Sequence, residues 1–390
     1  MSEIKVNSIK GVGASNAAIT VNNTDGTCTA NITNNLSNRN LIINGAMQVA
    51  QRGTSSTTSG YATLDRWTIQ YSSAGVTVTQ SQQATSSSDE PYQNGFQNFA
   101  RTALSGAGTT NTNAYIEFQQ RMEAQNIANS GWNFKSSSSN ITVSFWFRAS
   151  TNQTFYGYLT SYDGTAQRYT FSFTASGNNA WTKITKTIPG NSNLDFDNNN
   201  EPGLHLVLVP FYGTNYTNNK TLDAWAASDN TNFMPDMAST WLTAGASTFD
   251  ITGVQLEVGS VATDFEHRSF SDELMRCYRY YQVIAKGSDG TSGARAPLVS
   301  GSMWGTGGFY GVLTLKNKMR TIPSLDVVNG TDYWQVYNNT TDTCDTLAYN
   351  NASPEAISLY LSGNLNGTAY VGAWSRTNNA AAFVAAKAEL

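Results

Sequence analysis

The chain has 390 residues and a formal net charge of −4, with 13% charged and 12% aromatic residues. This balance excludes the clustered lysine and arginine that bind nucleic-acid phosphates, and no stretch reaches the roughly 18 uninterrupted apolar residues of a membrane-inserted helix. Abundant asparagine (41 residues), serine, threonine and glycine favour turns, and the aromatic residues favour strands, so the composition predicts a mainly β protein.

Residues 1–39 form a small N-terminal segment with three short strand-like runs separated by Gly- and Asn-rich turns. A segment of this size cannot bury a core of its own. We therefore expect it to pair with sister chains or to attach the protein to a larger particle. The apolar side chains expected to make these contacts are Ile4, Val6, Ile9, Ile19 and Val21.

Residues 40–268 are predicted to form a large jelly-roll-type β-sandwich. Apolar side chains alternate along 141–148 and 169–174, which is the pattern of strands with one buried face. The residues predicted to share the buried face are Val143, Phe145 and Phe147 in the first run and Tyr169, Phe171 and Phe173 in the second. Strands separated by short polar turns are typical of such sandwiches.

One α-helix, over residues 269–287, is predicted to link the sandwich to a second domain. Ser271 is its expected N-cap, and Lys286 followed by Gly287 its expected end. Its apolar face is formed by Leu274, Cys277, Tyr278 and Tyr281. We interpret the helix as a brace against one domain, with contacts between sister helices of an oligomer as the alternative.

Residues 288–390 are predicted to form this second, smaller β-sandwich domain. Tryptophan and tyrosine are frequent in its strand-like runs, and such rings can stack on the faces of sugars when they are exposed. The candidate contacts for a glycan or another host receptor are Trp304, Tyr310, Tyr333, Trp334 and Trp374. Ordinary core packing is the alternative for each of them.

Several segments resemble a known family. Residues 40–53 (NLIINGAMQVAQRG) and 61–67 (YATLDRW) resemble the opening of a domain common in phage tail-fibre and minor virion structural proteins. Residues 252–281 resemble its ending, and 318–324 (KMRTIPS) with 388–390 resemble the distal β domain that often follows.

The first nine residues are similar to the start of structural proteins from marine phages, especially those of cyanobacteria. The resemblance implies a carbohydrate-binding-module-like sandwich in a homotrimeric tail fibre or spike. Its partners would be copies of itself, other phage tail or capsid proteins, and host surface polysaccharide, and its location the virion after assembly in the host cytoplasm. The alternative is a purely structural capsid-decoration, collar or tail-adaptor protein without receptor binding.

The matched residues have plain structural tasks. Asp65 and Arg66 can form an ion pair at the edge of the sandwich with Trp67 in the core. Residues 255–257 alternate polar and apolar side chains on a closing strand, beside the opening strand. The motif residues given a structural role are Asn44, Gly45, Arg52, Asp65, Arg66, Trp67, Gln255, Leu256, Glu257 and Gly259.

No catalytic, metal or cofactor site is expected. The two histidines, His205 and His267, are not accompanied by a G-x-S-x-G nucleophile motif. The acidic run 195–201 has the even spacing of a calcium loop, but Asn200 stands where such a loop needs glycine. We therefore predict a solvated loop there, and a protein that is not an enzyme.

Overall fold

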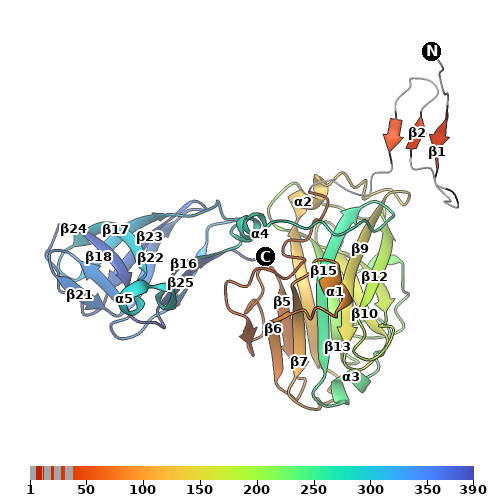
Figure 1. Cartoon of the computed structure of the whole chain (residues 1–390), viewed down its shortest axis with the longest axis horizontal. Coiled ribbons are helices and arrows are strands. Elements are labelled where there is room, and N and C mark those ends of the chain that lie inside the picture. Colours follow the sequence, from red (N-terminus) through yellow and green to blue (C-terminus); the bar gives the residue numbers. More distant parts are fainter. Residues whose placement is uncertain (1–5, 11, 13–18, 22–27, 31–37) are drawn as a thin grey trace.

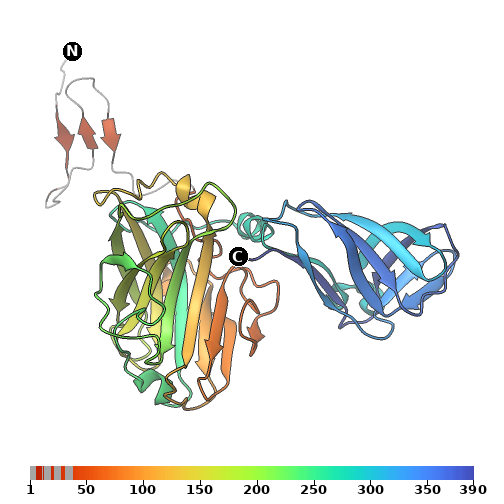
Figure 2. The same cartoon turned by 180° about the vertical axis from the view of Figure 1, so that it is seen from behind.

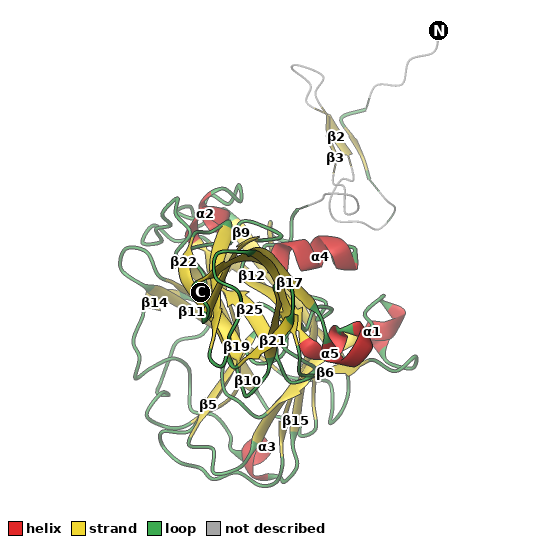
Figure 3. Cartoon of the chain, turned by 90° about the vertical axis from the view of Figure 1, so that its left-hand side faces the viewer, coloured by secondary structure: helices red, strands yellow, loops and turns green. Residues whose placement is uncertain are grey.

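Strands dominate the computed structural model, which describes residues 6–10, 12, 19–21, 28–30 and 38–390 (Figure 1). The described strands form five sheets, and the helices are short (Figure 3). The predicted fold class, a mainly β protein with β-sandwiches, is confirmed. None of the helices in these ranges is both long and apolar enough to cross a membrane.

A small antiparallel sheet lies at the N-terminal end, outside the large sandwich (Figure 1). It has the order β1-β2-β3, with β1 (Ser8–Ile9), β2 (Ile19–Val21) and β3 (Cys28–Ala30). Val6 and Ile9 are exposed, whereas Ile19 and Val21 are partly buried. Ile4, also a predicted attachment residue, lies outside the described residues.

Two six-stranded antiparallel sheets form the large sandwich, with the orders β14-β11-β10-β13-β8-β5 and β12-β9-β15-β7-β6-β4. The first sheet contains β5 (Thr68–Ser72), β8 (Tyr115–Glu123), β10 (Phe155–Ser161), β11 (Gln167–Phe173), β13 (Pro202–Tyr212) and β14 (Trp225–Ala227). The second contains β4 (Ser55–Ser56), β6 (Val78–Ala84), β7 (Asn98–Leu104), β9 (Asn140–Ala149), β12 (Thr182–Pro189) and β15 (Thr248–Val258). The short helices α1 (Glu90–Gln93), α2 (Ala124–Ala128) and α3 (Thr240–Thr243) lie in the connections.

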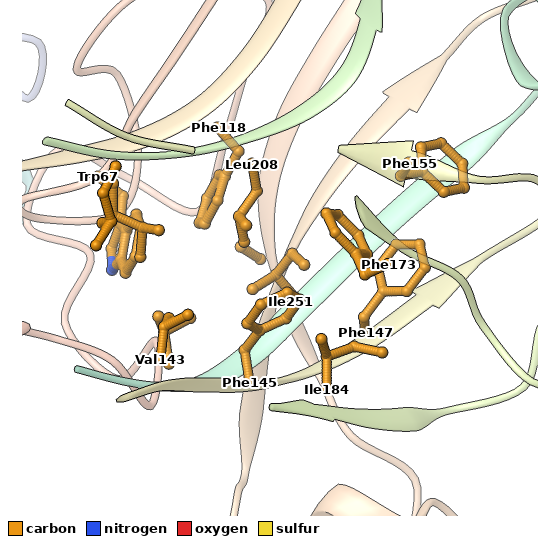
Figure 4. Close-up of a cluster of buried hydrophobic side chains, with 14 of the residues drawn as sticks. Trp67, Phe118, Val143, Phe145, Phe147, Phe155, Phe173, Ile184, Leu208 and Ile251 are labelled. Carbon is orange, nitrogen blue, oxygen red and sulfur yellow. The ribbon is translucent and has the colours of Figure 1, made fainter. Parts of the chain in front are cut away.

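The core between these sheets follows the predicted alternation. Phe145 and Phe147 of β9 contact Phe173 of β11, with ring centroids 5.3 and 4.9 Å apart (Figure 4). Because β9 and β11 belong to different sheets, these contacts join the two layers. Val143, Tyr169 and Phe171 are members of the same buried cluster.

The segment 40–45 lies beside β15, as expected for the opening of this domain. The backbone N–H of Leu41 donates to Leu256 O and that of Val254 to Gly45 O, both at 2.9 Å. It is not a regular strand, however, because Asn44 adopts a left-handed φ of 60°. The backbone instead turns there toward the helix that follows the sandwich.

That helix, α4 (Phe270–Cys277), is shorter than predicted, and the expected helix over 269–287 is wrong beyond Cys277. Its N-cap is Ser269, not Ser271. Tyr281–Lys286 forms strand β16, which pairs with the strand near the end of the chain. The tertiary pairing outweighs the local helical spacing because it satisfies the backbone groups in a sheet.

The distal unit, formed by β16 onward, is a smaller sandwich of a three-stranded and a seven-stranded sheet. Their orders are β16-β25-β19 and β21-β20-β24-β17-β18-β23-β22. The strands after β16 are β17 (Pro297–Trp304), β18 (Gly308–Thr314), β19 (Ser324–Val328), β20 (Trp334–Tyr337), β21 (Thr341–Cys344), β22 (Thr346–Ala352), β23 (Ala356–Ser362), β24 (Gly372–Thr377) and β25 (Phe383–Lys387). The 3-10 helix η1 (Gly287–Asp289) and helix α5 (Thr291–Ala294) precede β17. A separate buried cluster joins the two sheets.

The distal unit meets the large sandwich near α4 and the last residues of the chain, and otherwise stands clear of it (Figures 1 and 2). The outer face of its seven-stranded sheet is therefore not covered by the large sandwich.

Candidate functional site

Six aromatic side chains share the outer face of the seven-stranded sheet, which we call the aromatic face. The strand register places them together, because residues directly opposite each other in an antiparallel pair point to the same side. Tyr337 pairs with Trp374, and Tyr310 pairs with Tyr360. Trp304 ends β17 on the same face, and Tyr370 precedes β24 beside it.

These six rings form three contacting pairs. The centroids of Tyr337 and Trp374 lie 5.8 Å apart, those of Trp304 and Tyr370 6.2 Å, and those of Tyr310 and Tyr360 4.6 Å. Trp304 and Tyr370 are 70% and 76% exposed, values far above those of core aromatics. Exposed rings at this density are unusual on a solvated sheet face and indicate a contact surface.

Small residues lie between the three pairs. On β17, Ser300 pairs with Trp374 and Ser302 pairs with both Gly372 and Tyr310. Ser300, Ser302 and Gly372 are all exposed, and we call them the serine floor. A Cβ atom added at Gly372 would meet nothing within 4 Å, so the space above it is open. The three ring pairs therefore surround small side chains, with open space at Gly372.

The polar groups of this surface are available to a ligand. Within residues 38–390, the hydroxyl and indole N–H groups of the aromatic face and the two serine hydroxyls have no hydrogen-bond partner in the protein. Among residues of the seven strands only Asp342 and Arg376 are charged. Asp342 pairs with the buried Val336, on the opposite face, and Arg376 lies over the Trp374 ring with its Cζ 4.9 Å from the centroid.

The structure brings together three of the five predicted glycan contacts, Trp304, Tyr310 and Trp374. It excludes Trp334, which is fully buried and donates its Nε1–H to Asn329 Oδ1 at 2.7 Å. Tyr333 packs against the distal core instead of joining the aromatic face. In a strand with one buried face, alternate residues point inward, and Trp334 occupies an inward position.

Sequence reasoning missed Tyr337, Tyr360 and Tyr370. The first two were detectable: Tyr337 follows the buried Val336, and Tyr360 stands between the buried Leu359 and Leu361. Tyr370 lies outside any strand, so no periodicity could place it.

Asn44, the first motif residue, connects the two ends of the large sandwich. Its side-chain amide donates to Val49 O and Asp65 O at 2.8 and 2.9 Å. Its backbone N–H donates to Glu273 Oε1 of α4 at 2.6 Å, and its carbonyl accepts the Trp67 Nε1–H at 2.9 Å. The buried Asn44 therefore holds segments from three parts of the chain.

Its neighbour Gly45 allows the closing strand to approach, since a Cβ there would lie 2.1 Å from Val254 O. Leu256, on that strand, is fully buried. Trp67 lies in the core as predicted, stacked on Phe118 with a centroid distance of 4.5 Å.

The closing motif is a buried hydrogen-bond network. Glu257 Oε1 accepts from Gln255 Nε2 at 2.8 Å and from Thr263 N at 2.9 Å. Gln255 Oε1 accepts the backbone N–H of Glu266 at 2.8 Å. Gly259 has a φ of +130°, a conformation that L side chains rarely adopt. These residues fix the loop after β15 and have structural roles.

The expected Asp65–Arg66 ion pair is not formed. Asp65 instead lies beside Arg52, with Oδ1 3.9 Å from Nη1, and Arg66 pairs with Glu389. Burial raises the pKa of Asp65 to about 6, and the Arg52 guanidinium and hydrogen bonds from Gln51 only partly oppose this. The motif thus serves the joint between the sandwich and the distal unit.

A second charged contact crosses the same joint. Arg279 donates to both carboxylate oxygens of Glu123, at 2.6 and 2.7 Å, and the Tyr280 hydroxyl donates to Oε1 at 2.5 Å. Burial would raise the pKa of Glu123, but the hydrogen bonds from Arg279 and Tyr280 outweigh it and lower the pKa.

The histidines lie far from the aromatic face in sequence and in fold. His205, on β13, is buried with Nδ1 3.0 Å from the Tyr162 hydroxyl, and burial with nearby Arg121 and Arg168 lowers its pKa well below the usual range. His267 Nε2 lies 3.0 Å from Asn94 O. Within the described ranges, no three His, Cys, Asp or Glu side chains gather as metal ligands, and Asp195 of the acidic loop pairs with Lys135 at 3.1 Å.

The fold thus belongs to the class of mainly β proteins built from two-sheet sandwiches. No family model and no curated protein matches the chain. Among solved structures, the enzymatically active domain of tailspike protein 4 from bacteriophage CBA120 is 12% identical over 56% of this chain, with a TM-score of 0.31. That match covers 21% of the tailspike chain, so the matched part of this chain corresponds to about a fifth of it.

Two other similar structures cover more of their own length. A putative sugar binding protein from Bacteroides thetaiotaomicron is 13% identical over 57% of this chain and 100% of that one, with a TM-score of 0.32. The tripod from the baseplate of bacteriophage Tuc2009 is 10% identical over 84% of this chain and 90% of that one, with a TM-score of 0.26.

Proposed function

We propose that the protein is a structural component of a bacteriophage particle that contacts the host surface, including its glycans, through the aromatic face. The observation that carries the proposal is the aromatic face itself: three ring pairs on one sheet surface that no other described part of the chain covers. A stable solvated sheet would have polar residues there, so these rings have a role outside the fold.

The phage assignment is supported by the sequence resemblance of two segments, 40–67 and 252–281. Asn44 and Glu273, one from each segment, are hydrogen-bonded at 2.6 Å, and Val254 bonds to Gly45. The resembling residues therefore make one continuous structural unit, as expected if they were inherited together.

We further propose that the N-terminal segment attaches the protein to the particle and that the protein is a homotrimer. Support comes from the exposed apolar Val6 and Ile9, since exposed apolar side chains on a small sheet favour a partner. Asn38 N donates to Glu266 Oε1 at 2.8 Å, so a deletion should end at residue 37 to leave the sandwich intact. We expect the deleted protein to fold but not to join particles, and light scattering after gel filtration to give three times the chain mass for the full-length protein.

Binding to host cells tests the role of the aromatic face. We expect the fluorescently labelled unmodified protein to bind cells of some marine cyanobacterial strains, and the W304A/W374A double variant to bind at least ten-fold more weakly. The control is Y349A, because Tyr349 is exposed in the same sheet but pairs with the buried Leu359 on the opposite face. Equal binding by W304A/W374A and the unmodified protein would refute the proposed contact.

We also propose that the protein acts by binding and not by catalysis. The support is the make-up of the aromatic face, which has no carboxylate pair to cleave a glycosidic bond. Polysaccharide from bound host cells should keep its chain length after prolonged incubation with the protein. Release of short oligosaccharides would contradict the proposal.

A further inference from the structure

We propose that the ligand of the aromatic face is an uncharged polysaccharide, one of whose pyranose rings lies on the serine floor between the three ring pairs. This inference rests on the function proposed above and names the class of substrate. The shape, the available polar groups and the charge of the surface favour such a ligand.

The shape fits one sugar ring with its hydroxyl groups. Trp374 and Tyr310 stand on β24 and β18, with β17 between them, so their strands are about 10 Å apart. Ser302 lies between them in the register, opposite Gly372 on one side and Tyr310 on the other. Because Gly372 has no side chain and open space above it, the floor lies below the surrounding rings.

The polar groups fit hydroxyls. A pyranose ring has C–H groups on its faces, which pack on aromatic rings, and hydroxyls at its edge, which need hydrogen-bond partners. The Ser300 and Ser302 hydroxyls lie on the floor, and the tyrosine hydroxyls and indole N–H groups lie around it. All are without intramolecular partners in the described part of the chain.

The charge fits a neutral polymer. Arg376 is the one charged residue that the strands contribute to the aromatic face; its Nε donates to Gln335 Oε1 at 2.5 Å and its guanidinium lies over Trp374. A polymer with a uronic acid or phosphate in every repeat would need several arginines or lysines along its path, and the strands of this surface supply one. Binding should therefore depend little on salt.

Filling the floor without disturbing the fold gives a sharp test. A leucine side chain at position 372 would occupy the position proposed for the sugar ring. Its Cβ would have no protein atom within 4 Å. Gly106, in the large sandwich, also has open space at Cβ, so G106L is the matched control. The unmodified protein, G372L and G106L would be run through native gels at 50 and 500 mM NaCl. The gels would contain a neutral polymer (hydroxyethyl cellulose, laminarin, galactan or galactomannan) or an acidic one (polygalacturonate or alginate).

We expect at least one of the four neutral polymers to retard the unmodified protein and G106L equally at both salt concentrations. We expect G372L to bind that polymer at least ten-fold more weakly. Retardation by the acidic polymers alone, by no neutral polymer, or equally for G372L would overturn the inference. The cell-binding experiment separates the two proposals: loss of cell binding in W304A/W374A without neutral-polymer binding leaves the aromatic face as the contact but refutes the ligand class. Cell binding that survives in that variant refutes the contact itself.

Discussion

Arg66 and Glu389 form a largely buried ion pair although they lie 323 positions apart in the chain. The Arg66 guanidinium donates through Nη1 to Glu389 Oε2 at 2.5 Å, and its Cζ lies 3.5 Å from the centroid of the Tyr280 ring. Glu389 Oε1 also accepts from Arg52 Nη2 at 3.0 Å. The penultimate residue of the chain is thus clamped between two arginines of the large sandwich, which fixes the distal unit to it.

Replacing Glu389 by alanine should lower the free energy of unfolding by about 3 to 5 kcal/mol, because the buried Arg66 then loses its carboxylate partner and Arg52 keeps only the more distant Asp65. Urea unfolding followed by tryptophan fluorescence measures the change. The control is E355A, whose carboxylate pairs with Lys318 in solvent and should contribute at most about 1 kcal/mol. Equal losses for E389A and E355A would show that the pair does not secure the joint.

Asp65 should make stability depend on pH in the mildly acidic range. Its pKa in the folded protein is about 6, above the ordinary value of 3.8, so the folded state binds the proton more tightly than the unfolded chain. This stabilisation is complete below about pH 4 and is lost as the pH rises through 6. A shift of this size corresponds to about 3 kcal/mol.

The D65N variant tests this, because an amide does not titrate. Unfolding free energies at pH 4, 5, 6 and 7 should show that the unmodified protein loses stability relative to D65N as the pH rises. Parallel profiles for the two proteins would mean that Asp65 ionises in the fold as it does in water.

Ser269 should stabilise α4 as its N-cap. Its Oγ accepts the backbone N–H of Asp272 at 3.2 Å, so S269A should cost about 1 kcal/mol locally. We expect amide hydrogen exchange in residues 270–277 to become about five-fold faster. S271A, which alters a hydroxyl that does not cap the helix, should leave exchange nearly unchanged. Faster exchange in S271A than in S269A would show that Ser271 is the N-cap, as expected from the sequence.

Two tryptophans separate core from surface. Trp67 is buried and stacked on Phe118, so W67A should lower the free energy of unfolding by about 3 to 5 kcal/mol. Trp304 is largely exposed, and W304A should change it by about 0.5 kcal/mol or less. Thermal unfolding followed by circular dichroism measures both. A large loss of unfolding free energy in W304A would show that this ring stabilises the fold and would count against its proposed role in binding.

The alternation of apolar and polar residues was sufficient to predict the strands β9 and β11 and their buried faces. Phe145, Phe147 and Phe173 were predicted on inward faces and lie there, because the side-chain direction in a strand is set by local geometry. The same rule places Trp334 inside and Tyr337 outside in β20.

The sequence by itself therefore determined the mainly β class, the sandwich core and three of the six aromatic-face residues. Only the tertiary structure decided that α4 stops at Cys277, that Arg66 pairs with Glu389 and not with Asp65, and that Tyr370 lies beside Trp304. The physical reason is range. Periodicity and capping depend on neighbours a few residues away, whereas strand pairing, buried ion pairs and a surface built from five strands depend on how distant segments come together.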